Sequence, residues 1–286
     1  MSLPERNLNR PGDSPKYKLY GGILMKILSL TIMCLMLLLS GILPIGYADN
    51  LPVSERTIVG IIGAMDEEVA SLKAALEKPE ITSIAGMEFC RGKLDGADVV
   101  VVQCGIGKVN AGICAHTLIN DFGCTKIINT GVAGSLDARI NILDIVVSTD
   151  AVQHDFTVEA VGFAKGEIPY TGMYAFPADE TMRKAAVEAV HATTPDAQVF
   201  EGRVCSGDQF IASHEQKEKI INDFSGMCCE MEGGAIAQVC YLNKTPFVIV
   251  RVISDKADDS EEMNYELFLE KASARCAEIV RYMVTH

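Results

Sequence analysis

Short, continuous apolar runs recur along the chain from residue 57 onwards, and each leads into glycine or acidic residues. Thr57–Ile62, Val99–Val102 and Phe247–Ile253 are three of them, with Arg251 as the one charged residue inside the last run. Runs of this length, rich in β-branched residues, are typical of strands buried on both faces, as in parallel sheets covered by helices.

Segments between these runs predict the covering helices. Asp66–Leu72 begins a helix whose three first-turn acids suit the helix dipole. Met182–Ala192 predicts a surface helix, and Phe268–Val284 predicts an amphipathic one. His154–Tyr174 is a long polar loop. No Pro- or Ser-rich linker divides the chain. The pattern therefore predicts a single three-layer α/β/α domain around a mostly parallel mixed sheet.

Glycine-rich turns follow two of the predicted strands. Gly105–Gly112 comes after Val99–Val102, and Gly131–Ser135 comes after Ile127–Thr130. Neither has the spacing of a Walker loop or of the dinucleotide fingerprint. Because ligands in open α/β sheets bind beyond the carboxyl ends of the strands, these turns predict a pocket for a small molecule at one edge of the sheet.

Carboxylates lie at the same edge. Asp255 and Ser254 end the Phe247 run, Glu232 stands at the start of the small-residue helical run Glu230–Ala237, and Glu68 is in the first turn of a helix. Taken singly, each acid fits a helix cap or a first-turn position. Together, at one pocket, they fit acid–base chemistry.

The first 48 residues predict a leader. Lys26 precedes the apolar stretch Ile27–Leu43, and Gly46 and Ala48 stand at the two small-residue positions of a cleavage site. This order is that of a signal peptide, so we expect cleavage after Ala48, export to the periplasm or medium, and a body of residues 49–286 with no stable membrane association. The alternative is an uncleaved anchor. The polar first 24 residues make Met25 a second candidate for the start of translation.

The net charge limits the classes of partner that the protein is expected to bind. The whole chain carries −13 at pH 7, and removing a leader of net charge +3 leaves −16 on the body. Nucleic acids and anionic membranes are bound by lysine and arginine, so neither is an expected partner. The charge favours a protein that acts on a small molecule.

Ten cysteines invite a metal or disulfide interpretation, and their spacing favours neither. Nine fall in the body, an odd number, and no C-x-x-C pair occurs among them. The adjacent Cys228 and Cys229 are poorly placed to bind one metal ion together. We expect no metal site, and we expect the cysteines to act as small apolar residues.

Several blocks in the order of the chain resemble the 5′-methylthioadenosine/S-adenosylhomocysteine nucleosidases of the purine nucleoside phosphorylase superfamily. The resemblance covers Thr57–His286. The matching blocks are Gly60–Val69, Gly105–Val109, Asn129–Gly134, Ser206–Ile211, Glu230–Glu232 and Ser254–Asp255.

The resemblance implies a nucleoside phosphorylase-like fold and a hydrolase that cleaves an N-ribosidic bond to release adenine and a thioribose sugar. It implies that Glu68 activates the water, that Asp255 protonates the purine, and that Glu232 holds the ribose hydroxyls with Met231 packed beneath. It implies no cofactor and a homodimer. The other implied substrate-binding residues are Ile106, Phe210, Ile211, Arg251, Ser254 and Phe268.

Two positions depart from the family pattern. Val132 stands where the family often has a hydroxyl residue, and Val161 stands near the place of a frequent aromatic residue in a loop that reaches across the dimer. Three alternatives stay open: a phosphorolytic relative, a futalosine-type hydrolase, and an inactive exported nucleoside-binding protein. The first needs arginines or amide nests around phosphate, which the turns at Gly63–Glu68 and Gly131–Gly134 lack. The third has no use for an acid–base pair.

Overall fold

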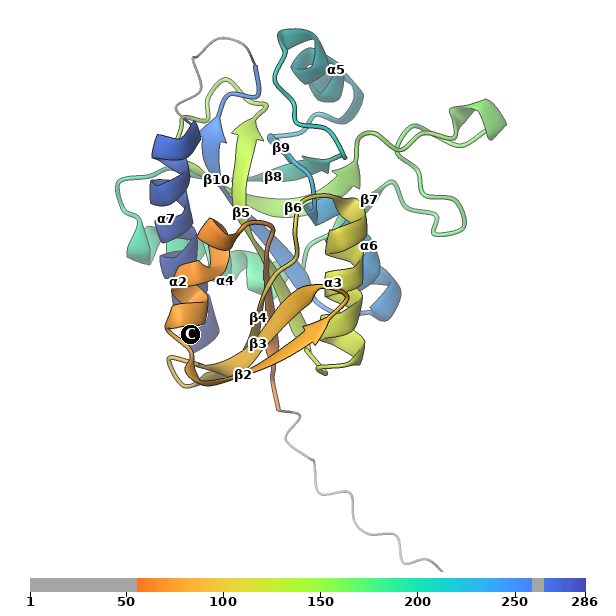
Figure 1. Ribbon diagram of the computed structural model, residues 1–286. Coiled ribbons are helices and arrows are strands. Elements are labelled where there is room, and N and C mark those ends of the chain that lie inside the picture. The colour runs from red at the N-terminus through yellow and green to blue at the C-terminus, as the bar shows by residue number, and fades with distance from the viewer. Residues whose placement is uncertain (1–55, 259–264) are drawn as a thin grey trace, which may run out of the picture. The chain divides into compact units, whose positions relative to one another are not determined.

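The computed structural model describes residues 56–258 and 265–286, and within this part Arg56–His286 forms one compact unit (Figure 1). The predicted leader, its cleavage site and the alternative start at Met25 lie outside the described residues. No helix in the described part of the chain is both long and apolar enough to cross a membrane.

Ten strands and six α-helices make up the fold of the described residues. The strands are β1 (Val59–Gly63), β2 (Glu77–Ile84), β3 (Met87–Leu94), β4 (Ala97–Gln103), β5 (Lys126–Ser135), β6 (Ile145–Gln153), β7 (Ala175–Pro177), β8 (Val199–Ser206), β9 (Cys228–Glu230) and β10 (Phe247–Asp255). The helices are α2 (Asp66–Ala74), α3 (Lys108–Asn120), α4 (Glu180–Thr193), α5 (His214–Phe224), α6 (Gly233–Asn243) and α7 (Tyr265–Thr285), with a short 3₁₀ turn η1 (Glu159–Val161).

All ten strands belong to one sheet, and part of it closes on itself. β10 pairs with both β5 and β6, and β6 leads through β8 and β9 back to β5, so these five strands form a ring. β1, β4, β3 and β2 extend outward from β5. The central pairings of β1, β4, β5 and β10 are parallel, which places the ends of β1, β5 and β10 at one edge.

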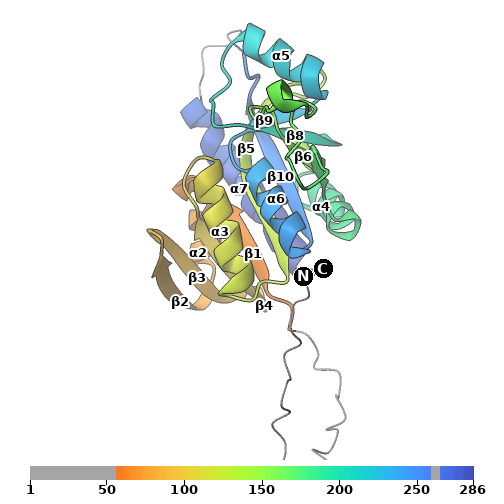
Figure 2. The same ribbon diagram turned by 90° about the vertical axis from the view of Figure 1, so that its right-hand side faces the viewer.

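Alternate residues of the strands face two different helix layers. On β10, Ile249 and Ile253 pack in one core cluster with residues of α3 and α6, whereas Val248, Val250 and Val252 pack in another with residues of α2, α4 and α7. Figure 2 shows α3 and α6 side by side on their face of the sheet. This two-sided burial explains why the strands appear in the sequence as continuous apolar runs.

The mixed α/β fold expected from the sequence is confirmed, with two differences in detail. Antiparallel pairs are as frequent as parallel ones, because the β2–β3 hairpin, β7 and β9 all join the sheet antiparallel to a neighbour. Gly131–Ser135, expected to be a turn, continues strand β5, because these small buried residues pair with β10 and β9. Likewise Glu230 ends β9, and helix α6 begins only after Glu232.

Candidate active site

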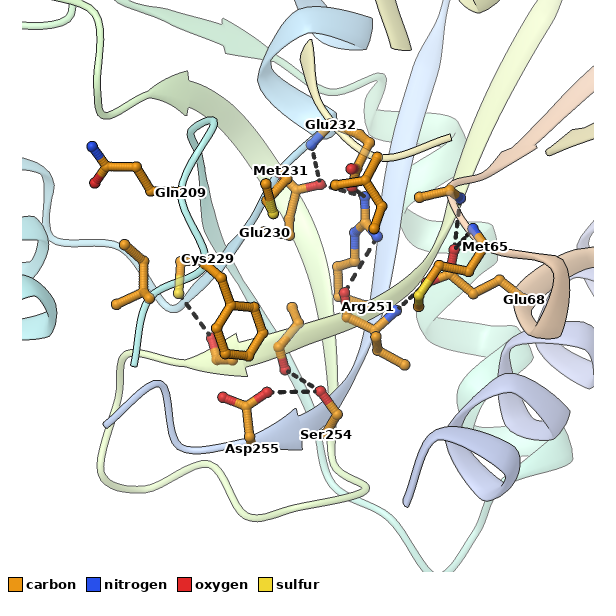
Figure 3. Close-up of a pocket in the computed structure, with 17 residues that line it drawn as sticks. Met65, Glu68, Gln209, Cys229, Glu230, Met231, Glu232, Arg251, Ser254 and Asp255 are labelled. Carbon is orange, nitrogen blue, oxygen red and sulfur yellow. Dashed lines mark hydrogen bonds and ion pairs between the residues drawn. The ribbon is translucent and has the colours of Figure 1, made fainter. Parts of the chain in front are cut away.

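A cavity opens at the edge where β1, β5 and β10 end, and it is lined by residues from six segments (Figure 3). Nine of the ten residues singled out from the sequence line it. They are Glu68, Ile106, Phe210, Ile211, Met231, Glu232, Arg251, Ser254 and Asp255. The other lining residues are Ala64, Met65, Val132, Ala133, Gly134, Gln209, Cys229 and Glu230.

Glu68 is a buried carboxylate in the first turn of α2. Its Oε2 accepts hydrogen bonds from the backbone N–H groups of Ala64 at 2.6 Å and Met65 at 3.0 Å, and its Oε1 accepts one from Val132 at 2.9 Å. Burial raises the pKa of this carboxyl, although Arg251 and the three N–H groups act in the opposite direction. A carboxylate held this way suits a general base, because its pKa is moved toward neutrality while its geometry is fixed.

Gly131 allows Glu68 and Arg251 to meet over strand β5. A Cβ atom on this residue would stand only 2.8 Å from Glu68 Cδ, and it would also run into the Arg251 guanidinium. No side chain larger than hydrogen fits between the strand and these two groups.

Arg251 is the largest fully buried side chain of the described residues. Its Nη2 donates to Asn129 Oδ1 at 2.6 Å and forms a short ion pair with Glu230, and its Nη1 donates to the Val132 carbonyl at 3.3 Å. Burial lowers the pKa of the guanidinium, and the carboxylates around it raise the pKa by more, so it stays charged. Arg251 makes no direct ion pair with Glu68 and acts on it through the field alone.

Glu230 is a charged residue of the site whose role was not predicted from the sequence. Besides the Arg251 ion pair, it accepts hydrogen bonds from the backbone N–H groups of Glu232 and Gly233 and from the Ser206 hydroxyl. It therefore serves as the charge partner that lets Arg251 remain buried. Its position directly after the buried pair Cys228–Cys229, at the end of a short strand, was the available signal.

Glu232 stands where β9 turns into α6. Its Oε1 accepts a hydrogen bond from the Gly107 N–H at 2.9 Å, and its Oε2 lies 3.8 Å from Arg251 Nη2. Burial and the nearby charge of Glu230 raise the pKa of Glu232 to about 7, with Arg251 and the Gly107 N–H opposing them. A second carboxylate thus lies close to Arg251 on the wall of the cavity away from Asp255 (Figure 3).

Asp255 is placed at the end of β10 by two hydrogen bonds. Its Oδ2 accepts from the Ser254 hydroxyl at 2.9 Å, and its Oδ1 accepts from the Ala257 N–H at 2.7 Å. Gly134 leaves room for it, because a Cβ there would lie 2.8 Å from Asp255 Oδ1. Asp255 and Glu68 therefore enter the cavity from different elements, which suits two separate roles.

Apolar side chains form the rest of the cavity wall. Ile211 is buried, whereas Ile106 and Phe210 are 54% and 53% exposed and stand at the rim. Met231 is half-buried between the two glutamates of its strand end. A flat aromatic base fits between such walls.

The rim loops are braced by an ion pair outside the cavity. Lys108 Nζ lies 2.5 Å from Asp155 Oδ1, and Asp155 Oδ2 accepts from the Asp208 N–H at 2.8 Å. Asp208 in turn accepts from the Lys108 N–H at 2.8 Å. This triangle joins the loop of Ile106 to the loop of Phe210. No sequence pattern marks this triangle, because its three members are far apart along the chain.

One expected site residue needs correction, and three other positions can be placed. Phe268 is half-buried on α7 and does not line the cavity, so the structure does not bring it to the other nine residues. Glu67, next to Glu68 in the first turn of α2, is exposed and lies outside the cavity lining. Val132 lacks a hydroxyl, but its backbone supplies an N–H to Glu68 and a carbonyl to Arg251. Val161 is exposed on η1.

Metal ligands are not grouped in this part of the protein. Within residues 56–258 and 268–286, no three His, Cys, Asp or Glu side chains are arranged to hold a metal ion. The nine cysteines at positions 90 to 276 are all buried and unpaired.

Comparisons with known proteins identify the family of the chain. A family model of the phosphorylase superfamily matches residues 58–285. The 5′-methylthioadenosine/S-adenosylhomocysteine nucleosidase of Psychromonas ingrahamii is 41% identical over 229 residues, which cover 80% of this chain and 98% of that protein. The same enzyme of Staphylococcus aureus is 42% identical, with 80% and 99% covered.

Solved structures give the same result. The nucleosidase of Colwellia psychrerythraea in complex with adenine has a TM-score of 0.77 and 38% identity, covering 80% of this chain and 95% of its own. The Neisseria meningitidis nucleosidase in complex with methylthio-immucillin-A has a TM-score of 0.76 and 35% identity, with 80% and 98% covered. A futalosine hydrolase of Helicobacter pylori has a TM-score of 0.75 and 32% identity, with 80% and 98% covered. The chain therefore belongs to the phosphorylase superfamily and, within it, to the family of the 5′-methylthioadenosine/S-adenosylhomocysteine nucleosidases, as its sequence blocks predicted.

Proposed function

We propose that the protein hydrolyses the N-ribosidic bond of 5′-methylthioadenosine, S-adenosylhomocysteine or a related adenine nucleoside, giving adenine and the free thioribose sugar. The observation that carries this proposal is the separation of Glu68 and Asp255 onto different walls of one cavity, with Glu232 on a third. The family relatives that bear this name, and the adenine bound by one of them, support it.

The proposed mechanism gives each carboxyl group one task. Cleavage of an N-riboside passes through a sugar with oxocarbenium-like positive charge, as in glycoside hydrolysis. Glu68 takes a proton from the attacking water, and Asp255 donates a proton to the purine so that adenine departs as a neutral molecule. Glu232 accepts hydrogen bonds from the ribose hydroxyls, and its negative charge favours the charge that develops on the sugar. Arg251 keeps Glu230 and Glu232 in place.

Water, rather than phosphate, is the proposed nucleophile. Among the described residues that line the cavity, Arg251 is the only cation, and Glu230 already neutralises it. Four carboxyl groups share the same space, namely Glu68, Glu230, Glu232 and Asp255. A phosphate dianion would be repelled there, since phosphate sites need unpaired arginines or amide nests.

Product analysis tests the reaction type. The purified protein is incubated with methylthioadenosine in phosphate-free buffer and again with phosphate. We expect equal rates of adenine release and a free sugar in both, because no phosphate site is needed. A sugar 1-phosphate among the products would replace hydrolysis by phosphorolysis. Tight binding with no adenine released would favour a nucleoside-binding protein.

Futalosine hydrolysis is the second candidate, and the likeness to the Helicobacter pylori futalosine hydrolase is the observation that favours it. The same experiment with futalosine in place of methylthioadenosine separates the two. We expect kcat/KM to be higher for the adenine nucleoside, and the opposite order would reassign the substrate.

We infer further that two copies of the chain associate through the face formed by α3 and α6. Val109 on α3 is 72% exposed, and Ile113, Tyr241 and Leu242 are other exposed apolar residues of these two helices. Apolar side chains gathered on neighbouring helices are typical of an interface between subunits. Sedimentation velocity should give a dimer for the wild type and a monomer for Val109→Asp, and a monomeric wild type would contradict the inference.

A further inference from the structure

Lys217, on helix α5, is a lysine with only 9% of its surface exposed. Its Nζ donates to the carbonyl of Lys256 at 2.7 Å and pairs with Asp258 Oδ2 at 2.8 Å. An ammonium group removed from water needs such partners, so these contacts fix its position. Both partners lie in the turn that follows strand β10.

This turn carries the carboxyl group of Asp255. The Ala257 N–H, two residues further on, donates to Asp255 Oδ1 at 2.7 Å. Ala257 is buried and has a φ of 53°, a left-handed conformation that only its surroundings can hold in a residue other than glycine. A turn that relaxed at Ala257 would release the hydrogen bond that aims the carboxyl group.

Helix α5, which carries Lys217, follows the segment that places Phe210 in the cavity wall. Gln209, Phe210 and Ile211 precede it and line the cavity. Ile211 packs with Ala257 and with Ile220 of α5 in one buried cluster. Lys217 therefore joins the wall on which a base would lie to the turn that carries its proton donor.

We propose that Lys217 is a positioning residue for the reaction: it holds the 256–258 turn against α5 and thereby keeps the Asp255 carboxyl directed at the leaving base. The inference rests on the proposed function. No bond is made or broken at Lys217. The proton passes from Asp255 to the purine as the N-ribosidic bond breaks, and Asp255 is left as a carboxylate.

The test compares two substrates that share one sugar. Methylthioadenosine needs a proton on its base, whereas the nitrophenyl riboside of the same sugar releases a stable anion and needs none. Lys217→Met keeps the apolar stem and removes the ammonium group. We expect its kcat on methylthioadenosine to fall about 10- to 100-fold, since a misplaced general acid loses much of a contribution of roughly 10²–10⁴. Its kcat on the nitrophenyl riboside should change less than about threefold.

Three further variants serve as references for the size of the Lys217→Met effect. Asp255→Asn should show the same selectivity with a larger loss, and Lys217→Arg should recover most of the rate because it keeps the charge. Lys219→Met removes one charge from the exposed side of the same helix and should leave both substrates unchanged. If the wild type is too slow on the nitrophenyl riboside, the N7-methylated nucleoside, already cationic on its base, takes its place.

The outcomes separate this inference from the proposed function. Equal losses on both substrates in a folded Lys217→Met, or no loss on either, would overturn the positioning role and leave the hydrolase assignment intact. A wild type that releases no adenine would instead overturn the function. If Lys217→Met does not fold by circular dichroism, Asp258→Asn removes the ion pair from the other side and is judged by the same ratio.

Discussion

The groups around Glu232 shift the pKa of its carboxyl group in opposite directions. Burial and Glu230 favour its neutral form, whereas Arg251 and the Gly107 N–H favour its charged form. A ligand with positive charge on its sugar would also favour the charged form of Glu232. The group is therefore suited to become fully charged as the sugar does.

Replacing Glu232 by Gln is expected to lower both binding and turnover. The variant keeps the size of the side chain but loses charge-assisted hydrogen bonds to the ribose, which is about 1.5–3 kcal/mol, or one to two decades in kcat/KM. Steady-state kinetics on methylthioadenosine measures this. An unchanged rate in the folded variant would leave Glu232 as a residue that only begins a helix.

The same variant should alter how stability depends on pH. Glu232 has a folded-state pKa of about 7, above its ordinary value of 4.5. The folded state therefore holds a proton more tightly, and this group makes the free energy of unfolding fall as pH rises from about 4.5 to 7. Glu232→Gln lacks this contribution, so its stability relative to wild type should improve over that window, by up to about 3 kcal/mol. Urea unfolding at pH 5 and pH 8 measures the difference.

The sequence of strand β5 is constrained by the side chains that pack over it. At Gly131 the strand passes directly beneath Glu68 and Arg251. Gly131→Ala should cost about 1–3 kcal/mol of stability through overpacking and should lower activity, because the new methyl group pushes Glu68 from its three N–H donors. Gly112→Ala in helix α3 is the matched control. There, the added methyl group meets only Val239 at 4.0 Å.

The two variants are compared by urea unfolding and by kcat. Gly112→Ala should keep its activity and gain slightly in stability, as alanine does in a helix. If Gly131→Ala matched it in both measurements, the close approach at β5 would have no functional weight.

Elements with an apolar face were predictable, and elements without one were not. β1, β4 and β10 are buried on both sides, so their apolar runs stand out in the sequence. Strand β2 is exposed along nearly its whole length and pairs only with β3, so no periodic pattern marks it. The closed ring could not be predicted either, because it depends on which strands meet and not on their composition.

The site divides in the same way. Glu68, Glu232 and Asp255 could be singled out because each lies where a strand ends or a helix begins. Glu230 also ends a strand, but its role and that of Lys217 could not be predicted, because they depend on partners 21 and 39 positions away in the sequence. Charge balance around Arg251 appears only once the chain is folded.

At the scale of the whole molecule, the leader predicted from the sequence leads to a proposal on where the protein works. We propose that cells expressing the full chain export it and yield a mature protein beginning near Asp49, because Gly46 and Ala48 fit the cleavage positions. N-terminal sequencing of the purified protein and fractionation of the cells measure this. An intact Ile27–Leu43 segment in the membrane fraction would mean anchoring instead.

Because of its nine unpaired cysteines, the lifetime of the protein depends on whether its compartment is oxidising. Every one of them is buried, so the native state shields its thiols from oxidants. An unfolded body of residues 49–286 exposes all nine at once, and an odd number of thiols cannot all pair within one molecule. In an oxidising compartment, refolding therefore competes with the formation of non-native or intermolecular disulfides each time the protein unfolds. The working lifetime of the protein there would be set by its unfolding rate rather than by its equilibrium stability.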